Sequence, residues 1–167
     1  MAPKLTEQAV EFIASFEGYR AAAYNDGADP PNATIGYGHE LHAGPVTGED
    51  AKLYWTREQA LAQLRRDVAR AEQTVRELVH VRLGLVPARA DARFGMLVSL
   101  CFNIGGGSLC KSTLIREVNR KGAPRDWRAV VPYWLEWVYA GSVRLEGLER
   151  RRRAEVVNFL AGKITTY

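Results

Sequence analysis

Residues 19–46 interrupt the helical periodicity of the rest of this chain, and this interruption limits the folds that the chain can adopt. Before it, apolar residues at helical spacing from Leu5 to Phe16 predict an amphipathic helix over about 5–17. Within it, short apolar runs are separated by the turn-forming sequence NDGADPPN, which predicts a small hairpin or sheet. A small sheet set into a mainly helical sequence is typical of the α+β class.

The sequence after this region predicts helices to the end of the chain. TREQ at 56–59 is a capping box, which opens a long connecting helix expected over about 57–80. Pro87 then begins a largely helical lobe expected over about 87–162, in which Trp134 and Trp137 are expected to pack. Since no repeat and no long linker divides the chain, we expect one domain over 1–167, with a small β lobe, a connecting helix and a helical lobe.

A formal net charge of +4 and a sequence pI near 9.2 predict a mildly basic surface that is attracted to polyanions. The arginine run near the C-terminus contributes to this charge, and we expect Arg150, Arg152 and Arg153 to form a solvated helix face. Acidic residues within the first apolar run argue against a signal peptide, and no stretch approaches the 18 apolar residues that a membrane-spanning helix needs. We therefore expect synthesis in the cytoplasm.

Cysteine and histidine positions exclude some kinds of site. The chain has two cysteines, Cys101 and Cys110, which we expect to be buried free thiols, although pairing across the intervening GGG sequence stays open. The three histidines lack metal-ligand spacing with the cysteines, so no metal is expected. A phosphate loop would need a Lys and a Ser or Thr at Walker spacing, so we expect GGGS at 105–108 to be a turn between helices and not a nucleotide site.

Three polar residues in the region FEGYRAAAYNDGADPPNATIGYGHE could perform acid–base chemistry. Glu17 ends an apolar helix beside aromatic residues, and desolvation there favours a protonated carboxyl that can act as a general acid. Asp26 lies in a polar turn where it would stay ionised, and Thr34 opens the TIGYGH strand and could hold a water with it. Inverting hydrolysis of a glycosidic bond needs this combination of acid, base and water. Each residue alone also has an ordinary structural explanation.

FEGYRAAAYNDG and TIGYGH resemble the signature of the phage-type lysozymes, the muramidases of glycoside hydrolase family 24. The segments WTREQALAQLRRDV, LVSLCFNIGGGSLCKSTLIREVN, WVYAGS and GLERRRRAE are similar to later family segments, in the same order. The resemblance implies the two-lobed lysozyme-like fold. It also implies cleavage, with inversion and without a cofactor, of the β-1,4 bond between N-acetylmuramic acid and N-acetylglucosamine in peptidoglycan.

The resemblance implies roles for the three polar residues. Glu17 matches the general acid, Asp26 the carboxylate that positions the water, and Thr34 the third member of the triad. Asp26 and Thr34 are eight positions apart, where many relatives have six. We interpret the extra residues as a longer hairpin tip, which makes Asp29 a weak rival to Asp26.

Other residues take roles only through the resemblance. His39 and Asp67 are expected to form a structural pair between the lobes. Arg151 matches an arginine that approaches the catalytic Glu, where its positive charge would oppose the effect of desolvation. Four residues match positions that line the saccharide cleft, with core packing an equal alternative for the first of them: Phe102, Asn103, Ser112 and Thr113.

The resemblance implies an endolysin of a phage or prophage, acting as a monomer on peptidoglycan and binding no nucleic acid. It would be made in the host cytoplasm and reach the periplasm and the cell wall through a holin-type membrane permeabiliser. Three alternatives stay open: a non-catalytic basic module that binds wall or nucleic acid, a glycosidase for chitin or chitosan, and an injected antibacterial effector.

Overall fold

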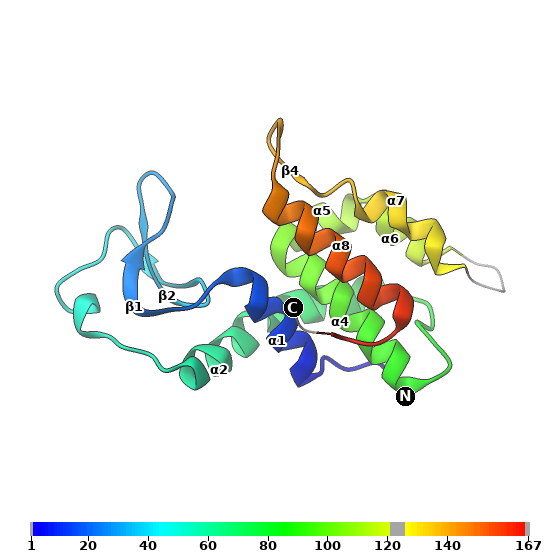
Figure 1. The fold of residues 1–167 in the computed structure, drawn as a ribbon, viewed down its shortest axis with the longest axis horizontal. Helices are drawn as coiled ribbons and strands as arrows, with labels where there is room; N and C mark the ends of the chain where they lie inside the picture. The colour runs from blue at the N-terminus through cyan, green and yellow to red at the C-terminus, as the bar shows by residue number, and fades with distance from the viewer. Residues whose placement is uncertain (1, 121–125, 166–167) are drawn as a thin grey trace. The chain divides into compact units, whose positions relative to one another are not determined.

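The computed structural model describes residues 2–120 and 126–165, and these divide into two compact units (Figure 1). Residues 10–69 form the first, which we call the sheet unit. Residues 2–9 and the described residues from 70 onward form the second, which we call the helical unit. A three-stranded sheet lies in the first unit and most of the helices lie in the second, as expected for a mainly helical α+β chain.

Helix α1 (Glu7–Glu17) leads into the sheet. Gly18 follows it with a φ of 71°, a left-handed conformation that a residue without a β-carbon adopts at little cost. The helix therefore ends at Glu17, as the sequence predicts, and the chain turns into the first strand. The apolar stripe of α1 is buried: Ala9, Val10, Phe12, Ile13 and Ala14.

The sheet is antiparallel and has the order β1 (Arg20–Asn25), β2 (Asn32–Gly36), β3 (His39–Ala43). The central strand β2 is the most buried, because it has a neighbour on both sides. Gly36 at its end has a φ of 69°, and a β-carbon there would lie 3.1 Å from both the Trp55 ring and the Ala60 side chain. Glycine thus allows the chain to turn while β2 packs closely against the segment that enters the next helix.

Beyond β3, the 3₁₀ turn η1 (Asp50–Lys52) leads to helix α2 (Arg57–Asp67). The predicted capping box is confirmed, since Thr56 accepts from the Gln59 backbone N–H and the Gln59 side chain accepts from that of Thr56. The prediction of one continuous helix over 57–80 is wrong. Val68, which is fully buried, has a ψ of −11°, far from the helical value of about −42°. Helix α2 therefore ends there, although the Val68 N–H still donates to the Leu64 carbonyl at 2.9 Å, and a separate helix α3 (Ala69–Leu78) follows.

The helical unit is organised around α4 (Pro87–Ile104) and α8 (Glu146–Ala161), which lie side by side (Figure 1). Pro87 occupies the first turn of α4, where its missing N–H costs no hydrogen bond. The remaining elements are α5 (Gly106–Lys111), α6 (Thr113–Val118), η2 (Trp127–Val130), α7 (Val131–Trp134), β4 (Tyr139–Ala140) and β5 (Val143–Arg144).

Two parts of the predicted helical lobe need comment. Residues 121–125, which the sequence places in that lobe, lie outside the described residues. The β4–β5 hairpin lies between helices of the lobe that the sequence predicts to be largely helical, and Gly141 takes a φ of 61°, which allows the chain to reverse. Trp134 is fully buried as predicted, whereas Trp137 is only partly buried. No helix in the described part of the chain is both long and apolar enough to cross a bilayer.

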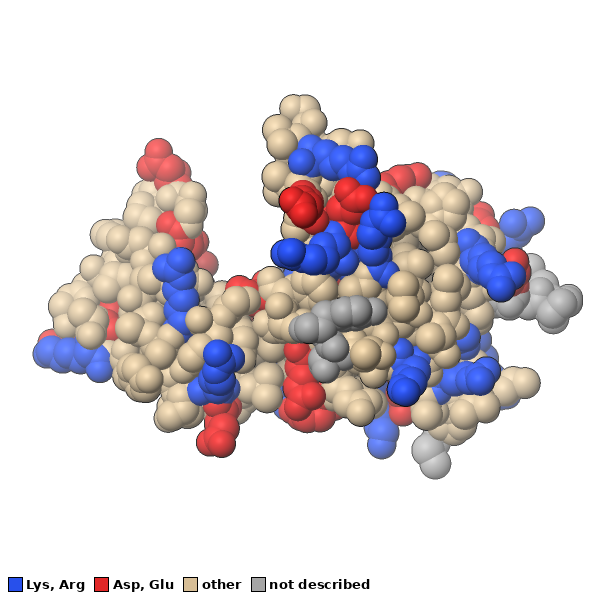
Figure 2. Space-filling view, viewed as in Figure 1, with Lys and Arg blue, Asp and Glu red and all other residues tan. Residues whose placement is uncertain are grey.

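Charged side chains on the helical unit form mixed clusters. Figure 2 shows Lys and Arg beside Asp and Glu around the β4–β5 hairpin and the start of α8. Arg144 and Arg153 both pair with Glu149, at 2.8 and 2.7 Å. The prediction of a solvated face holds for Arg150 and Arg153 but is wrong for Arg152, whose side chain is completely buried.

The cysteines also differ in part from expectation. Both are free thiols, and Cys101 is buried in α4 as predicted. Cys110 is exposed, because it lies on the outer face of the short helix α5, one residue after the buried Leu109. Burial raises the pKa of the Cys101 thiol to about 11.

Candidate active site

Glu17 is the last residue of α1, and its side chain is half-buried. On the same helix, the rings of Phe12 and Phe16 pack against each other with centroids 5.2 Å apart. After Gly18, the Tyr19 ring packs against the Tyr37 ring, with centroids 5.6 Å apart. The carboxyl therefore follows an aromatic segment at a helix end, the local setting that the sequence predicts for it.

Asp26 lies in the turn directly after β1, and backbone N–H groups hold its carboxylate. Its Oδ1 accepts from the N–H of Asn32 at 2.8 Å and from the N–H of Ala28 at 3.1 Å. Its Oδ2 accepts from the Asn32 side-chain amide at 3.2 Å. These bonds, first that from the Asn32 N–H, lower the pKa of Asp26 below its ordinary value, because they stabilise the charged form. The carboxylate is thus suited to stay ionised and accept a hydrogen bond.

Thr34 lies in the central strand and is placed close to Asp26 by strand pairing. Thr34 is the partner of Tyr24 across β1 and β2, and a backbone bond of 3.0 Å from Asp26 N–H to Asn32 C=O continues the same ladder. Since side chains alternate along a strand, Asp26 and Thr34 belong to the same face of the ladder, two positions apart. The buried Thr34 hydroxyl lies 3.4 Å from the Asn32 carbonyl, which can accept from it.

Asn32 is a residue that the sequence analysis missed. It contacts both Asp26 and Thr34, and its position in DPPN has the composition of an ordinary turn. Asn32 precedes Thr34 by two residues, a spacing that places both side chains on one face of a strand. This spacing could have identified Asn32 as a neighbour of the site. Asp29, the rival to Asp26, is exposed in the same loop.

His39 and Asp67 form an ion pair as the resemblance implies, but the expectation that this pair joins the two lobes is wrong, because both residues belong to the sheet unit. His39 Nδ1 lies 3.0 Å from Asp67 Oδ2. Gln63, which the sequence analysis did not single out, donates to Asp67 at 2.9 Å, and the His39 ring stacks on Trp55 with centroids 5.6 Å apart. The pair ties β3 to α2.

The residues expected to line a saccharide cleft lie in the helical unit. Phe102 and Asn103 are in the last turn of α4, where Phe102 is half-buried and Asn103 is exposed. Ser112 is buried and caps α6, accepting from Ile115 N–H at 3.2 Å and donating to a backbone carbonyl. The Ser112 hydroxyl therefore has a structural role at the start of α6. Thr113 is half-buried and accepts a bond of 2.8 Å from a neighbouring arginine.

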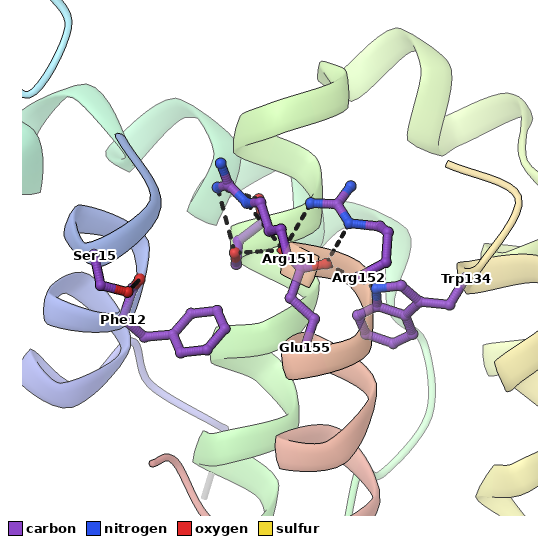
Figure 3. Close-up of polar contacts among 7 residues, drawn as sticks. Phe12, Ser15, Trp134, Arg151, Arg152 and Glu155 are labelled. Atoms are coloured by element: carbon purple, nitrogen blue, oxygen red, sulfur yellow. Dashed lines mark hydrogen bonds and ion pairs between the residues drawn. The ribbon is translucent and has the colours of Figure 1, made fainter. Parts of the chain in front are cut away.

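Arg151 lies in a buried polar cluster of the helical unit (Figure 3). Its side chain is 3% exposed and bonds to Glu155 at 3.3 Å and to the Ser99 carbonyl at 3.3 Å. Arg152 joins the cluster because it precedes Glu155 by three residues on α8 and so shares its core-facing side. Glu17 belongs to the other unit, and the expected approach of Arg151 to it stays a prediction. Within residues 2–120 and 126–165, no group of three His, Cys, Asp or Glu side chains could hold a metal ion.

The chain is similar in sequence to endolysins of several phages. The endolysin of Salmonella phage P22 is 33% identical over 139 residues, which cover 82% of this chain and 85% of that protein. The endolysin of Bacillus phage B103 is 30% identical over 162 residues, 95% of this chain. The present chain spans 55% of the length of that longer relative.

Comparisons with solved structures and with protein families also find phage lysozymes and endolysins. The solved structure of an endolysin from Escherichia coli O157:H7 phage FAHEc1 is similar, with a TM-score of 0.78 and 28% identity over 98% of this chain and 97% of that one. The phage lysozyme family profile matches residues 14–155. The chain therefore belongs to the phage lysozyme family and is a hydrolase of the endolysin type.

Proposed function

We propose that Glu17, Asp26 and Thr34 hydrolyse the β-1,4 bond between N-acetylmuramic acid and N-acetylglucosamine in peptidoglycan, with inversion at the anomeric carbon. The observation that carries this proposal is the Asp26 carboxylate, held ionised by three N–H donors on the ladder face that it shares with Thr34. Family membership supports peptidoglycan as the substrate.

In the proposed reaction, Glu17 protonates the glycosidic oxygen as the bond from this oxygen to the anomeric carbon breaks. A water held by Asp26 and Thr34 attacks the opposite face of the sugar and gives a proton to Asp26. The new C–O bond therefore has the inverted configuration. One proton enters the leaving alcohol and one leaves the water, so the reaction needs no cofactor.

The helical unit would supply contacts to the sugar chain in this proposal. Phe102 offers an aromatic surface at the end of α4, and the exposed Asn103 amide suits the N-acetyl groups of the substrate. Ser112 and Thr113 would contribute mainly by fixing the start of α6, since both hydroxyls already have partners. His39, Asp67 and Arg151 would act as supporting residues.

We propose the following cellular setting. Endolysins act on the cell wall, and this chain would accumulate as a monomer in the host cytoplasm and cross the membrane through a holin-type permeabiliser. The wall is then degraded from the periplasm and the host cell lyses.

Product analysis with two matched variants tests the reaction. Asp26→Asn should lower kcat on purified peptidoglycan by about 10²–10⁴-fold, the usual contribution of general base catalysis. Asp29→Asn, an equivalent change in the same loop, should keep native activity because Asp29 is exposed and outside the ladder. Proton NMR of fresh product should show α-anomeric muramic acid reducing ends.

Three results would contradict the proposal. Initial β-anomers would exclude inversion. Cleavage of chitin in preference to peptidoglycan would change the substrate. Wall binding by the folded protein without new reducing ends would leave the non-catalytic binding module as the explanation.

A further inference from the structure

Asn32 contacts both members of the triad that lie on the sheet. Its backbone N–H and its side-chain amide donate to the two oxygens of Asp26, at 2.8 and 3.2 Å. Its carbonyl oxygen lies 3.0 Å from Asp26 N and 3.4 Å from the Thr34 hydroxyl. We propose that Asn32 is a positioning residue for hydrolysis, which fixes the Asp26 carboxylate and orients the Thr34 hydroxyl toward one water. This inference rests on the proposed function of the triad.

The two carboxylate oxygens of Asp26 have different environments. Oδ1 accepts from two backbone N–H groups, those of Ala28 and Asn32. Oδ2 accepts a hydrogen bond from the side-chain amide of Asn32. A carboxylate has about four acceptor sites, so Oδ2 keeps capacity for a water. The side-chain amide of Asn32 therefore determines the rotation of the carboxylate and hence where that water binds.

The contact of Asn32 with Thr34 determines whether the Thr34 hydroxyl acts as a donor or as an acceptor toward a water. When the Thr34 hydroxyl donates to the Asn32 carbonyl, its own oxygen is left as an acceptor. A water between Asp26 and Thr34 then donates one hydrogen to each, and its lone pair points away from both. This is the orientation that attack on an anomeric carbon requires.

The loop explains how Asn32 reaches this position. Asp26 ends the first arm of a hairpin and Asn32 begins the second, so the backbone bond between them closes the loop that contains GADPP. The loop is two residues longer than the spacing of the family pattern. Asn32 thus holds the catalytic carboxylate on the sheet despite the longer hairpin tip.

Kinetics of Asn32→Ala and Asn32→Asp test the role. Removing the amide donor should lower kcat about tenfold or more with KM nearly unchanged, since a hydrogen bond to a charged group contributes at least that factor. Asn32→Asp keeps the size and the backbone bonds but places a second negative charge beside Asp26. That charge raises the pKa of Asp26, so the acid limb of the kcat profile should move to higher pH by about one unit.

Asn25→Ala is the matched control. Asn25 lies one residue before Asp26 and accepts a bond of 2.7 Å from Val46 N–H, without a contact to the carboxylate. The Asn25→Ala variant should keep the native kcat and the native acid limb of the kcat profile. A thermal melt of each variant reports whether the sheet is intact.

A double variant separates positioning from general stability. If Asn32 acts through Asp26, adding Asn32→Ala to Asp26→Asn should cause no further fall in kcat, because the group that it positions is already gone. A further tenfold fall would contradict the inference, as would native kcat and native acid limb in Asn32→Ala. Native activity of Asp26→Asn itself would instead overturn the proposed function, so the two failures are distinguishable.

Discussion

Arg152 and Glu155 form an ion pair of 2.9 Å on α8 in which both side chains are completely buried. Glu155 also accepts from Ser99 at 2.6 Å and from the Trp134 indole at 2.9 Å, and it pairs with Arg151 (Figure 3). One carboxylate thus serves two guanidinium groups and two neutral donors from three helices. A buried charge is tolerated only when it is paired and hydrogen-bonded in this way.

Replacing Glu155 should therefore destabilise the protein strongly. Glu155→Gln removes the negative charge that compensates the buried guanidinium groups. It also replaces one acceptor oxygen by an NH₂ group that faces other donors. Together these changes should cost about 3–5 kcal/mol of unfolding free energy. Urea denaturation followed by circular dichroism measures the loss. Glu149→Gln is the control on the same helix, because Glu149 pairs with arginines that are more than half exposed, and its effect should be much smaller. Equal losses in the two variants would contradict this account.

The His42–Asp50 pair should make stability depend on pH. His42 Nδ1 lies 3.0 Å from the Ala43 carbonyl and its Nε2 lies 2.9 Å from Asp50, so both ring nitrogens face acceptors. The carbonyl, and then Asp50, raise the pKa of His42. Hydrogen bonds, first from the Thr47 hydroxyl, lower the pKa of Asp50 to about 2.

The directions of these two pKa shifts define the pH range in which the pair stabilises the protein. The contribution of His42 is fully present below its unfolded pKa of about 6.5 and is lost as pH rises through the raised folded value. The contribution of Asp50 is present above its unfolded pKa of about 3.9 and is lost as pH falls toward about 2. The difference in Tm between the native protein and His42→Gln should thus be largest between about pH 4 and 6.5 and shrink above that range. A constant difference up to pH 9 would contradict the assignment.

The thiols should differ in reactivity. Cys110 is exposed, whereas Cys101 is buried and its raised pKa of about 11 keeps it protonated at pH 8. A maleimide should therefore label one thiol in the folded protein, at Cys110, and both thiols in urea. Mass spectrometry of tryptic peptides identifies the site. Labelling of Cys101 in the folded state, or of neither thiol in urea without reductant, would show that the described thiol states are wrong.

Local sequence signals predict several elements because neighbouring residues determine them. Glu17 ends α1 because Gly18 follows it, and Thr56 caps α2 because Gln59 lies three residues on. The strand containing Thr34 follows from its apolar run after a Pro-rich turn. These features depend on backbone conformations and hydrogen bonds within a few residues.

Other features depend on distant residues, and the sequence does not reveal them. Arg152 looks like part of a solvated charge run, yet the positions of Trp134 and Glu155 make its site a buried one. Val68 has a ψ of −11° although it lies within a sequence of continuous helical periodicity, so its neighbours in the sequence do not mark the interruption. Asn32 resembles an ordinary turn residue until strand pairing brings it to Asp26.

The central claim is that Glu17 is the acid of a peptidoglycan hydrolase, and one comparison tests it most directly. Release of muramic acid reducing ends from purified peptidoglycan is measured for the native protein, for Glu17→Gln and for Glu11→Gln, a change of the same kind at an exposed position of the same helix. Release should be native for Glu11→Gln and slower by about 10²–10⁴-fold for Glu17→Gln, with an unchanged melting curve for both variants. Native release by a folded Glu17→Gln protein would contradict it.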